Sequence, residues 1–257
     1  MGDLRLVRSE LLLKQPSVRF GMSTRIGGVS PEPLGLNLSL RVGDDPVNVA
    51  ENRKRFFGSL GFSESGSAIP HQCHSGNVQI VSQPGTYDAC DGLVTQTNNL
   101  PLIVTVADCL PVVLYDSVNS ALGLIHAGWR GTAQGIVAEA VDLMVEQCGA
   151  NTEGLIAFLG PSAGVCCYEV GREVAEVFSL DEVEQRDDRL YLNLKRANCH
   201  QLLSMGLNEE NIEISPSCTI CTPQLFHSYR RDGNNSGRMM AAVSIVTQIG
   251  SQPSNRV

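Results

Sequence analysis

The sequence predicts a single α/β domain of the mixed α+β type, covering residues 1–257, in which mixed β-sheets are flanked by helices. The chain has 257 residues, of which 42% are hydrophobic and 18% are charged, as in a globular domain with a large core. Strand-like and helix-like stretches alternate without a strict period, which disfavours a regular βαβ array. No linker or internal repeat divides the chain, so one domain is expected.

Short apolar stretches rich in β-branched residues and bounded by turn residues predict the strands. In chain order they are residues 18–24, 78–81, 102–107, 112–115, 121–125, 155–159, 212–214 and 239–246. The turn-rich segment 116–120 separates two of these strands, which predicts a β-hairpin. Asp91 and Gly92 form a predicted turn that leads into one further strand.

Helical periodicity predicts the helices. Residues 47–60 follow Asp45, a predicted N-cap, and Pro46, a residue favoured at the first helical position. Residues 131–148 give the clearest helix, because their apolar side chains recur on one face. Shorter helices are expected at 171–178 and 194–205.

Charge and composition narrow the class of partner. The net charge of −8 argues against nucleic acid, because that affinity comes from clustered Lys and Arg. Charged residues interrupt every apolar run within residues 1–8, so we expect no signal peptide. No segment has the roughly 18 consecutive apolar residues that a membrane span needs. Nine cysteines without an export signal indicate reduced thiols and a cytoplasmic protein. We expect a small-molecule or protein substrate, and leave open whether the chain forms a homodimer.

Polar residues at the ends of predicted buried strands indicate a site. Cys109 follows the strand at 102–107, and His126 follows the strand at 121–125, so a hairpin would bring the thiol and the imidazole together. His74 lies upstream, just before another predicted strand. Catalytic zinc sites use three ligands of the His, Cys and carboxylate types and leave a fourth position for water. Cys109, His126 and His74 would therefore suffice for a catalytic zinc centre.

The identity of the metal and of one ligand stays open. Zinc lowers the pKa of bound water toward ~7, but a Cys and His ligand set also admits copper. His71 competes with His74; in an extended segment the two face opposite sides, and we favour His74 because it precedes a bend at Ser75 and Gly76. The alternative interpretation is that Cys109 is a buried core thiol and that the histidines are structural.

Three arginine-bearing segments are candidates for anion binding. Arg25 lies in a glycine-rich loop that exposes backbone N–H groups. Arg130 lies at the start of the predicted helix 131–148, whose partial positive charge would favour an anion near His126. Arg230 belongs to a third segment, which also contains Arg231 and Arg238; the alternative is that these charges are simply exposed to solvent.

Four other cysteines form two short patterns. Cys218 and Cys221 form a C-x-x-C pattern, but no second pair stands at zinc-finger spacing, so a redox or structural metal role has little support. Cys166 and Cys167, next to Tyr168, are interpreted as apolar packing.

Ordered motifs span nearly the whole chain. They are S-T-R-I-G-G-V-S at 23–30, N-L at 37–38, G-D-D at 43–45, N-R at 52–53, Q-x-H at 72–74, D-G-L-V-T at 91–95, A-D-C-L-P at 107–111, H-A-G-W-R-G at 126–131, G-P-S at 160–162, C-Y-E-V-G at 167–171, Y-R-R-D at 229–232 and G-R at 237–238. With these motifs the chain resembles the bacterial laccase-domain family. Its members are also described as multicopper polyphenol oxidoreductase-like proteins and as purine nucleoside phosphorylases with adenosine deaminase activity.

The resemblance implies that His74, Cys109 and His126 are zinc ligands. It implies a fold shared with cytotoxic-necrotizing-factor-type deamidases, whose site pairs a Cys with a His. It also implies phosphorolysis of purine nucleosides such as adenosine, inosine and methylthioadenosine, and deamination of adenosine. Two positions depart from the pattern: Ser75 stands where Gly usually follows the ligand His, and Cys73 precedes that His.

Roles follow for individual residues. The catalytic candidates are Cys109, His126, His74 and Asp108, with Asp108 carrying a proton during attack of water on C6 of the purine. Charge and motif placement also suggest residues that bind the nucleoside and phosphate. These are Arg25, Asn37, Arg130 and Arg230.

Three other functions compete with this hypothesis. A copper-dependent polyphenol oxidase needs many histidine ligands, and the chain has five histidines in all, so this function falls behind. A metal-free hydrolase would use Cys109 as nucleophile and His126 as base. A scaffold or cell-envelope partner protein with a vestigial site is the third, and the intact ligand set argues against it.

Overall fold

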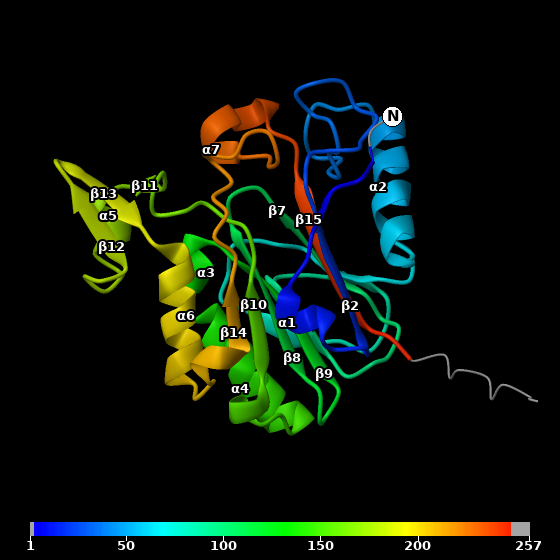
Figure 1. The fold of residues 1–257 in the computed structure, drawn as a ribbon, viewed down its shortest axis with the longest axis vertical. Coiled ribbons are helices and arrows are strands. Elements are labelled where there is room, and N and C mark those ends of the chain that lie inside the picture. The colour runs from blue at the N-terminus through cyan, green and yellow to red at the C-terminus, as the bar shows by residue number, and fades with distance from the viewer. Residues whose placement is uncertain (1–2, 248–257) are drawn as a thin grey trace, which may run out of the picture.

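The computed structural model describes residues 3–247, and its layers run helix, sheet, sheet, helix across the molecule (Figure 1). The predicted class, α/β with mixed sheets flanked by helices, is confirmed. The expected extent of the domain, 1–257, includes residues 1–2 and 248–257, which lie outside the described residues. That these residues form one domain with the rest stays a prediction.

The first sheet joins the two ends of the described chain. Its strand order is β1 (Leu6–Val7), β2 (Val18–Ser23), β15 (Met239–Ile245), β7 (Leu102–Val106), β3 (Ala68–Pro70) and β5 (Gly85–Tyr87). The pairs from β1 to β7 are antiparallel, and β3 pairs in parallel with β7 and β5. The sheet is therefore mixed. The sequence predicts β2, β7 and β15 but not the short strands β1, β3 and β5.

The second sheet contains the predicted hairpin. Its order is β14 (Ile212–Ile214), β10 (Ile156–Leu159), β8 (Leu110–Asp116), β9 (Ala121–Ala127), β6 (Gly92–Thr95) and β4 (Val78–Ile80). β8 and β9 pair antiparallel, with Pro111 opposite His126. The start of β8 and the end of β9 therefore lie side by side, which places Cys109 next to His126, as the sequence predicts.

Apolar side chains fill the space between the two sheets. Both sheets contribute to one buried cluster, in which Met22 and Val104 of the first sheet meet Leu124 of the second. Phe20 and Phe158 come from opposite sheets and pack edge to face, with ring centroids 5.3 Å apart. Each such side chain contributes about 1.5–3 kcal/mol to folding by leaving water. This core makes a rigid base for the strand ends.

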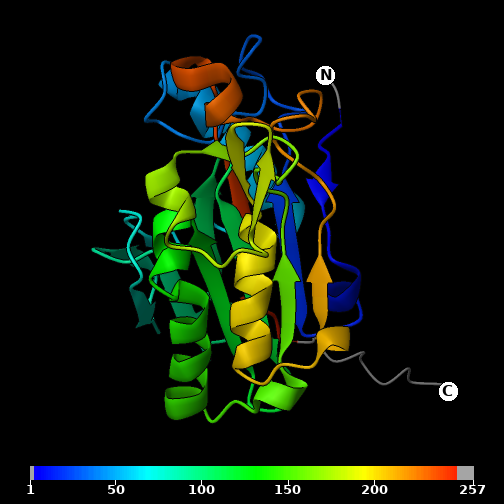
Figure 2. The same cartoon turned by 90° about the vertical axis from the view of Figure 1, so that its left-hand side faces the viewer.

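Helices cover the outer faces of both sheets. α2 (Pro46–Leu60) packs Phe56 and Phe57 against the first sheet, and the Asp45 side chain accepts from the Val47 N–H at its start, so the predicted N-cap is confirmed. α4 (Ile136–Cys148) and α6 (Leu194–Ser204) lie next to each other over the second sheet (Figure 2). No helix among residues 3–247 has the length and apolar character needed to cross a membrane.

Two predicted helices differ from the structure. Residues 131–148 do not form one helix: α3 (Trp129–Ala133) ends before Gly135, which has φ 76°, and α4 begins after it. This left-handed conformation suits glycine and breaks the helical path. The helix predicted at 171–178 is the single turn α5 (Arg172–Ala175).

The remaining elements are short. A third sheet, which the sequence does not predict, has the order β11 (Glu169–Val170), β13 (Arg189–Leu192) and β12 (Val183–Arg186) and stands at one side of the molecule (Figure 1). The other helical turns are α1 (Glu10–Leu13), α7 (Tyr229–Asp232), and the 3₁₀ turns at Thr152–Gly154, Glu209–Asn211 and Gly233–Asn235.

Candidate functional site

The hairpin end gathers three donor side chains, which we name the histidine–cysteine site: His74, Cys109 and His126. One donor atom of each lies within 4.8 Å of the others. The rings of His74 and His126 are perpendicular, with centroids 5.1 Å apart. His71 lies outside this group, and its Nδ1 contacts Asp88 at 3.1 Å.

Asp91 holds the site together, a role that the sequence did not reveal. Its carboxylate lies 2.8 Å from Nδ1 of His126 and accepts the backbone N–H groups of His74 (3.0 Å) and Ser75 (2.7 Å). Burial of the carboxylate raises its pKa, but the hydrogen bonds from His126 and Ser75 outweigh burial and keep the pKa far below its usual range. A buried, ionised Asp91 therefore fixes the ring of His126 and the loop of His74.

Backbone conformation also shapes the site. His74 has φ 61° and Asp108 has φ 87°, in the left-handed region that residues other than glycine rarely adopt. A Cβ atom on Gly128 would lie 3.1 Å from the Cys109 sulfur and 3.2 Å from Cδ2 of His74. The absence of a side chain at Gly128 therefore lets the backbone approach two of the three donors closely.

The three donors are electrostatically coupled. Burial raises the pKa of Cys109, but the charges and hydrogen bonds of His126 and His74 outweigh it and bring the pKa to about 6. Burial lowers the pKa of His126, but Cys109 and Asp91 raise it to about 9. Without a metal, these opposite shifts favour a thiolate on Cys109 and an imidazolium on His126.

The donor set fits a zinc ion. Two imidazoles and a thiolate are three of the ligand types that catalytic zinc uses, and they leave a fourth position open. The carboxylate on Nδ1 of His126 leaves Nε2 directed toward Cys109, as is common for histidines that bind metals. The resemblance and the geometry therefore point to the same residues.

Asp108 lies beside the site but has both carboxylate oxygens occupied. Oδ1 accepts the hydroxyl of Thr219 at 2.6 Å, and Oδ2 accepts the backbone N–H of Arg230 at 2.7 Å. The residue therefore links the loop before β8 to the segments that carry Thr219 and α7.

Two arginines form a cationic wall next to Cys109. The Arg230 guanidinium lies over the ring of Tyr168 at 5.2 Å, and that of Arg238 lies over Tyr229 at 5.2 Å. Burial and the nearby Cys109 raise the pKa of Tyr168 to about 12. Burial lowers the pKa of Arg238, while its negative neighbours, Asp108 and Cys109 among them, oppose this shift. The sequence suggested the segment that carries Arg230 and Arg238 as an anion-binding candidate, but only the fold shows that Arg238 and Tyr168 lie close to Cys109.

The other predicted substrate residues have different surroundings. Arg130 is exposed and stacks on Trp129 at 4.5 Å. The Arg25 guanidinium pairs with Glu32 and donates to the carbonyl of Pro223, so it holds loops together. Asn37 is fully buried, and its side chain bonds the backbone of Ser39 and Arg238 and the carboxylate of Asp44.

The prediction that Cys166 and Cys167 serve apolar packing was wrong, because Cys166 is exposed. Cys166 and Cys167 are not simply packed among apolar groups: their sulfurs and those of Cys218 and Cys221 all lie within 4.8 Å of one another. The second pair that the C-x-x-C pattern lacks in the sequence is supplied by a distant segment. We name this group the four-cysteine cluster.

Two titratable groups of this region, the Cys218 thiol and the Lys195 ammonium, have shifted pKa values. Burial raises the pKa of Cys218, but backbone N–H donors from Cys221, Gly164 and Ile220 outweigh burial and lower it to about 7. Burial lowers the pKa of Lys195 to about 8, and the nearby Cys218 opposes that shift.

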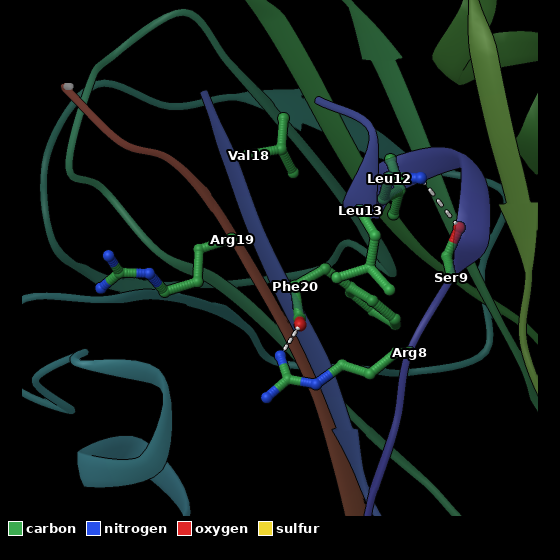
Figure 3. Close-up of a pocket in the computed structure, with 7 residues that line it drawn as sticks. All are labelled: Arg8, Ser9, Leu12, Leu13, Val18, Arg19 and Phe20. Carbon is green, nitrogen blue, oxygen red and sulfur yellow. Dashed lines mark hydrogen bonds between the residues drawn. The ribbon is translucent and has the colours of Figure 1, made fainter. Parts of the chain in front are cut away.

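A small pocket of about 80 Å³ lies elsewhere, beside α1 and β2 (Figure 3). It is lined by Arg8, Ser9, Leu12, Leu13, Val18, Arg19 and Phe20. The Arg8 guanidinium donates to the carbonyl oxygen of Phe20 and so serves the fold. None of the three donors of the histidine–cysteine site lines this pocket.

Comparisons with known proteins agree with the motifs. The profile of the family described as multi-copper polyphenol oxidoreductase laccase matches residues 19–246. The chain belongs to this family. A protein of Deinococcus radiodurans named purine nucleoside phosphorylase is 39% identical over 248 residues, covering 93% of this chain and 94% of that protein. The purine nucleoside phosphorylase YlmD of Bacillus subtilis is 33% identical over 243 residues, covering 88% of this chain and 87% of that protein.

Solved structures have the same fold. The crystal structure of YlmD from Geobacillus stearothermophilus superimposes with a TM-score of 0.87 at 31% identity, covering 93% of this chain and 94% of that one. The Bacillus licheniformis protein YfiH gives a TM-score of 0.84 at 34% identity, with 89% and 92% covered. The layered architecture is therefore that of the laccase-type family.

Proposed function

We propose that the protein is a purine nucleoside phosphorylase that also deaminates adenosine, with its chemistry centred on His74, Cys109 and His126. The observation that carries this proposal is the convergence of these three donors beside the arginine wall of Arg230 and Arg238. The names of the Deinococcus radiodurans and Bacillus subtilis relatives support phosphorolysis. Adenosine, inosine and methylthioadenosine are the substrates to test.

Phosphorolysis needs an anion site beside the ribose, and we assign it to Arg230 and Arg238. The backbone of Arg230 is bonded to Asp108, and the negative charges of Asp108 and Cys109 act on Arg238. Aromatic rings under both guanidinium groups limit their motion, which favours bidentate binding of a phosphate. Arg130, on α3, is a second candidate, whereas Arg25 and Asn37 are assigned to holding the loops.

The proposed metal is zinc, with copper as the other candidate. When bound by His74, Cys109 and His126, it would supply Lewis acidity and lower the pKa of a water. Asp91 orients the His126 ring, and the lack of a side chain at Gly128 lets Cys109 and His74 pack against the backbone there.

Asp108 is assigned a positioning role rather than the proton-carrying role suggested by the sequence. Its two oxygens are occupied by Thr219 and Arg230, so loss of the charge would loosen the phosphate wall. Asp108→Asn is therefore expected to raise the KM for phosphate more than it lowers kcat. A proton carrier would instead show a lower kcat with a changed pH profile.

The deciding experiment combines metal content with product analysis. Purified protein is incubated with adenosine or inosine, with and without phosphate, and hypoxanthine, adenine, inosine and ribose 1-phosphate are separated by chromatography. We expect phosphate-dependent base release and phosphate-independent inosine formation, both lost on chelation and restored by zinc rather than copper. Bound zinc with no nucleoside product would refute the proposed substrate.

A second candidate is a metal-free cysteine hydrolase, favoured by the Asp91–His126–Cys109 arrangement. A carboxylate on Nδ1 of His126 and a thiol of low pKa are what a cysteine nucleophile needs. The predicted likeness to cytotoxic-necrotizing-factor-type deamidases belongs to this candidate. Full activity in chelated protein, together with inactivation by iodoacetamide at Cys109, would favour the hydrolase over the metal enzyme.

A further inference from the structure

The four-cysteine cluster joins two segments that are far apart in the sequence. Cys166 and Cys167 lie in the loop before β11, and Cys218 and Cys221 lie between β14 and α7. Their four sulfurs lie within 4.8 Å of one another, and the Cys166 and Cys221 sulfurs are 3.7 Å apart. None of these residues belongs to the histidine–cysteine site.

The backbone holds the two segments in place without a disulfide between the four cysteines. Ser162 and Cys218 form an isolated parallel bridge, and the Thr219 N–H donates to the Ser162 carbonyl at 3.0 Å. The Gly164 N–H donates to the Cys218 sulfur at 3.2 Å. A Cβ atom on Gly164 would lie 3.0 Å from Cβ of Cys218 and 3.3 Å from the Cys166 sulfur. The site is therefore built by close packing of both segments.

A buried ammonium group lies near the four cysteines, and its positive charge would stabilise thiolates there. The Lys195 ammonium is buried, donates to the carbonyls of Ser215 and Ser217 at 2.6 and 2.7 Å, and feels the charge of Cys218. The Arg186 guanidinium donates to the carbonyl of Cys166 at 3.3 Å and also pairs with the Glu184 carboxylate, which balances its charge. Four thiolates around a divalent cation carry a net charge of about −2, and the Lys195 ammonium would offset part of it.

We propose that Cys166, Cys167, Cys218 and Cys221 bind one structural zinc ion, separate from the histidine–cysteine site. Zinc–sulfur bonds of about 2.3 Å in a tetrahedron put the sulfurs about 3.8 Å apart, close to the 3.7 Å between Cys166 and Cys221. A four-iron cluster holds its cysteines at the outer corners of an inorganic cube, farther apart than this group allows. Four protein ligands leave no open position, so the ion would be structural rather than catalytic.

This ion would stabilise one wall of the histidine–cysteine site. Thr219 lies within the C-x-x-C segment and donates its hydroxyl to Asp108, and Tyr168 follows Cys167 and stands close to Cys109. Tying the two segments together would therefore fix Thr219 and Tyr168 in place. The inference does not depend on which reaction the protein catalyses.

Metal content of single-site variants tests the proposal. Protein purified under reducing conditions, without added metal, is analysed by mass spectrometry for zinc per chain. We expect about two ions in wild type, about one in Cys109→Ser, about one in Cys221→Ser and none in the double variant. Cys199→Ser, a half-buried cysteine outside both groups, is the matched control and should keep two.

A second measurement identifies the ligands and does not require the cluster variants to fold. In Cys109→Ser, X-ray absorption at the zinc edge should show four sulfur neighbours at about 2.3 Å. Nitrogen or oxygen ligands in that spectrum would overturn the proposal. So would a zinc content that Cys166→Ser and Cys221→Ser leave unchanged, or a disulfide joining Cys166 and Cys221 in protein that holds one zinc.

Discussion

The histidine–cysteine site and the four-cysteine cluster are built from similar donors but anchored differently. In the first, a buried carboxylate, Asp91, holds His126 and the His74 loop, and the Gly128 backbone packs closely against Cys109 and His74. In the second, backbone N–H groups and the Lys195 ammonium surround four sulfurs, with no carboxylate bonded to Lys195 among residues 3–247. The first arrangement suits chemistry on a bound molecule, and the second suits holding chain segments together.

Cys109→Ser should have the largest effect, because it changes the histidine–cysteine site and leaves the four-cysteine cluster intact. The substitution removes a donor of the histidine–cysteine site, so turnover of inosine and phosphate should fall by more than about 1,000-fold. Release of hypoxanthine measures the loss, with Cys199→Ser as control. If more than a tenth of the activity survived, the chemistry would have to lie outside this site.

Asp91→Asn should have the next largest effect. The change removes the charge that orients His126 and anchors the His74 loop, so zinc affinity or activity should fall by about 10–100-fold. In chelated protein, the pKa of His126 should fall and that of Cys109 should rise. The rate of Cys109 alkylation by iodoacetamide against pH reports this shift. Asp88→Asn, an exposed carboxylate that contacts His71, is the control and should leave the midpoint near pH 6.

Gly128→Ala should have a moderate effect on the histidine–cysteine site. A Cβ atom would lie 3.1 Å from the Cys109 sulfur and 3.2 Å from Cδ2 of His74, so both donors would have to shift, and we expect about a tenfold loss of kcat/KM. Gly154→Ala is the matched control, because a Cβ atom there meets nothing within 4 Å. Equal behaviour of the two variants would show that the positions of Cys109 and His74 do not limit the reaction.

Cys221→Ser should act mainly on stability. Loss of the second zinc would free the segments that carry Thr219 and Tyr168, so the Tm should fall by several degrees while kcat changes by less than about threefold. Thermal unfolding and steady-state kinetics are compared on the same preparation. A loss of activity as large as that of Cys109→Ser would mean that the two groups act as one site.

The smallest effect concerns pH. The His126 pKa is raised from 6.5 to about 9, so its stabilisation is full below pH 6.5 and is lost as the pH rises through 9. The Cys109 pKa is lowered from 9.0 to about 6, so its stabilisation is full above pH 9 and is lost as the pH falls through 6.

Between pH 6.5 and 9 these two slopes have opposite signs and cancel. The difference in unfolding free energy between chelated wild type and Cys109→Ser/His126→Gln should therefore be nearly flat in this range. Urea unfolding at several pH values measures it. A slope near 1.4 kcal/mol per pH unit would show that only one of the two groups is shifted.

The sequence predicted the structural features that depend on residues close together in the chain. The apolar strands around the turn at 116–120 predicted the β8–β9 hairpin and so the meeting of Cys109 and His126, and Asp45 with Pro46 predicted the start of α2. Gly135 was missed as a helix break, because a single glycine is compatible with a helix until its φ is known.

Long-range contacts could not be predicted in this way. Asp91 reaches His126 only because β6 pairs with β9, and nothing near Asp91 in the sequence shows that its carboxylate is buried. The four-cysteine cluster depends on two segments that meet after the sheets have formed. Clustered charge pointed to the segment of Arg230 and Arg238 as an anion-binding candidate, but it did not show that Arg238 and Tyr168 lie close to Cys109.

The left-handed backbone at His74 and Asp108 sets a limit on how thermostable this protein can become. Each such conformation costs about 1–3 kcal/mol for a residue with a side chain, and the hydrogen bonds to Asp91 offset part of that cost at His74. Glycine at either position would relax the backbone but remove a working side chain. Selection for heat resistance alone would therefore favour glycine at these two positions at the expense of activity. Stabilising substitutions that keep activity have to lie in the sheets and helices instead.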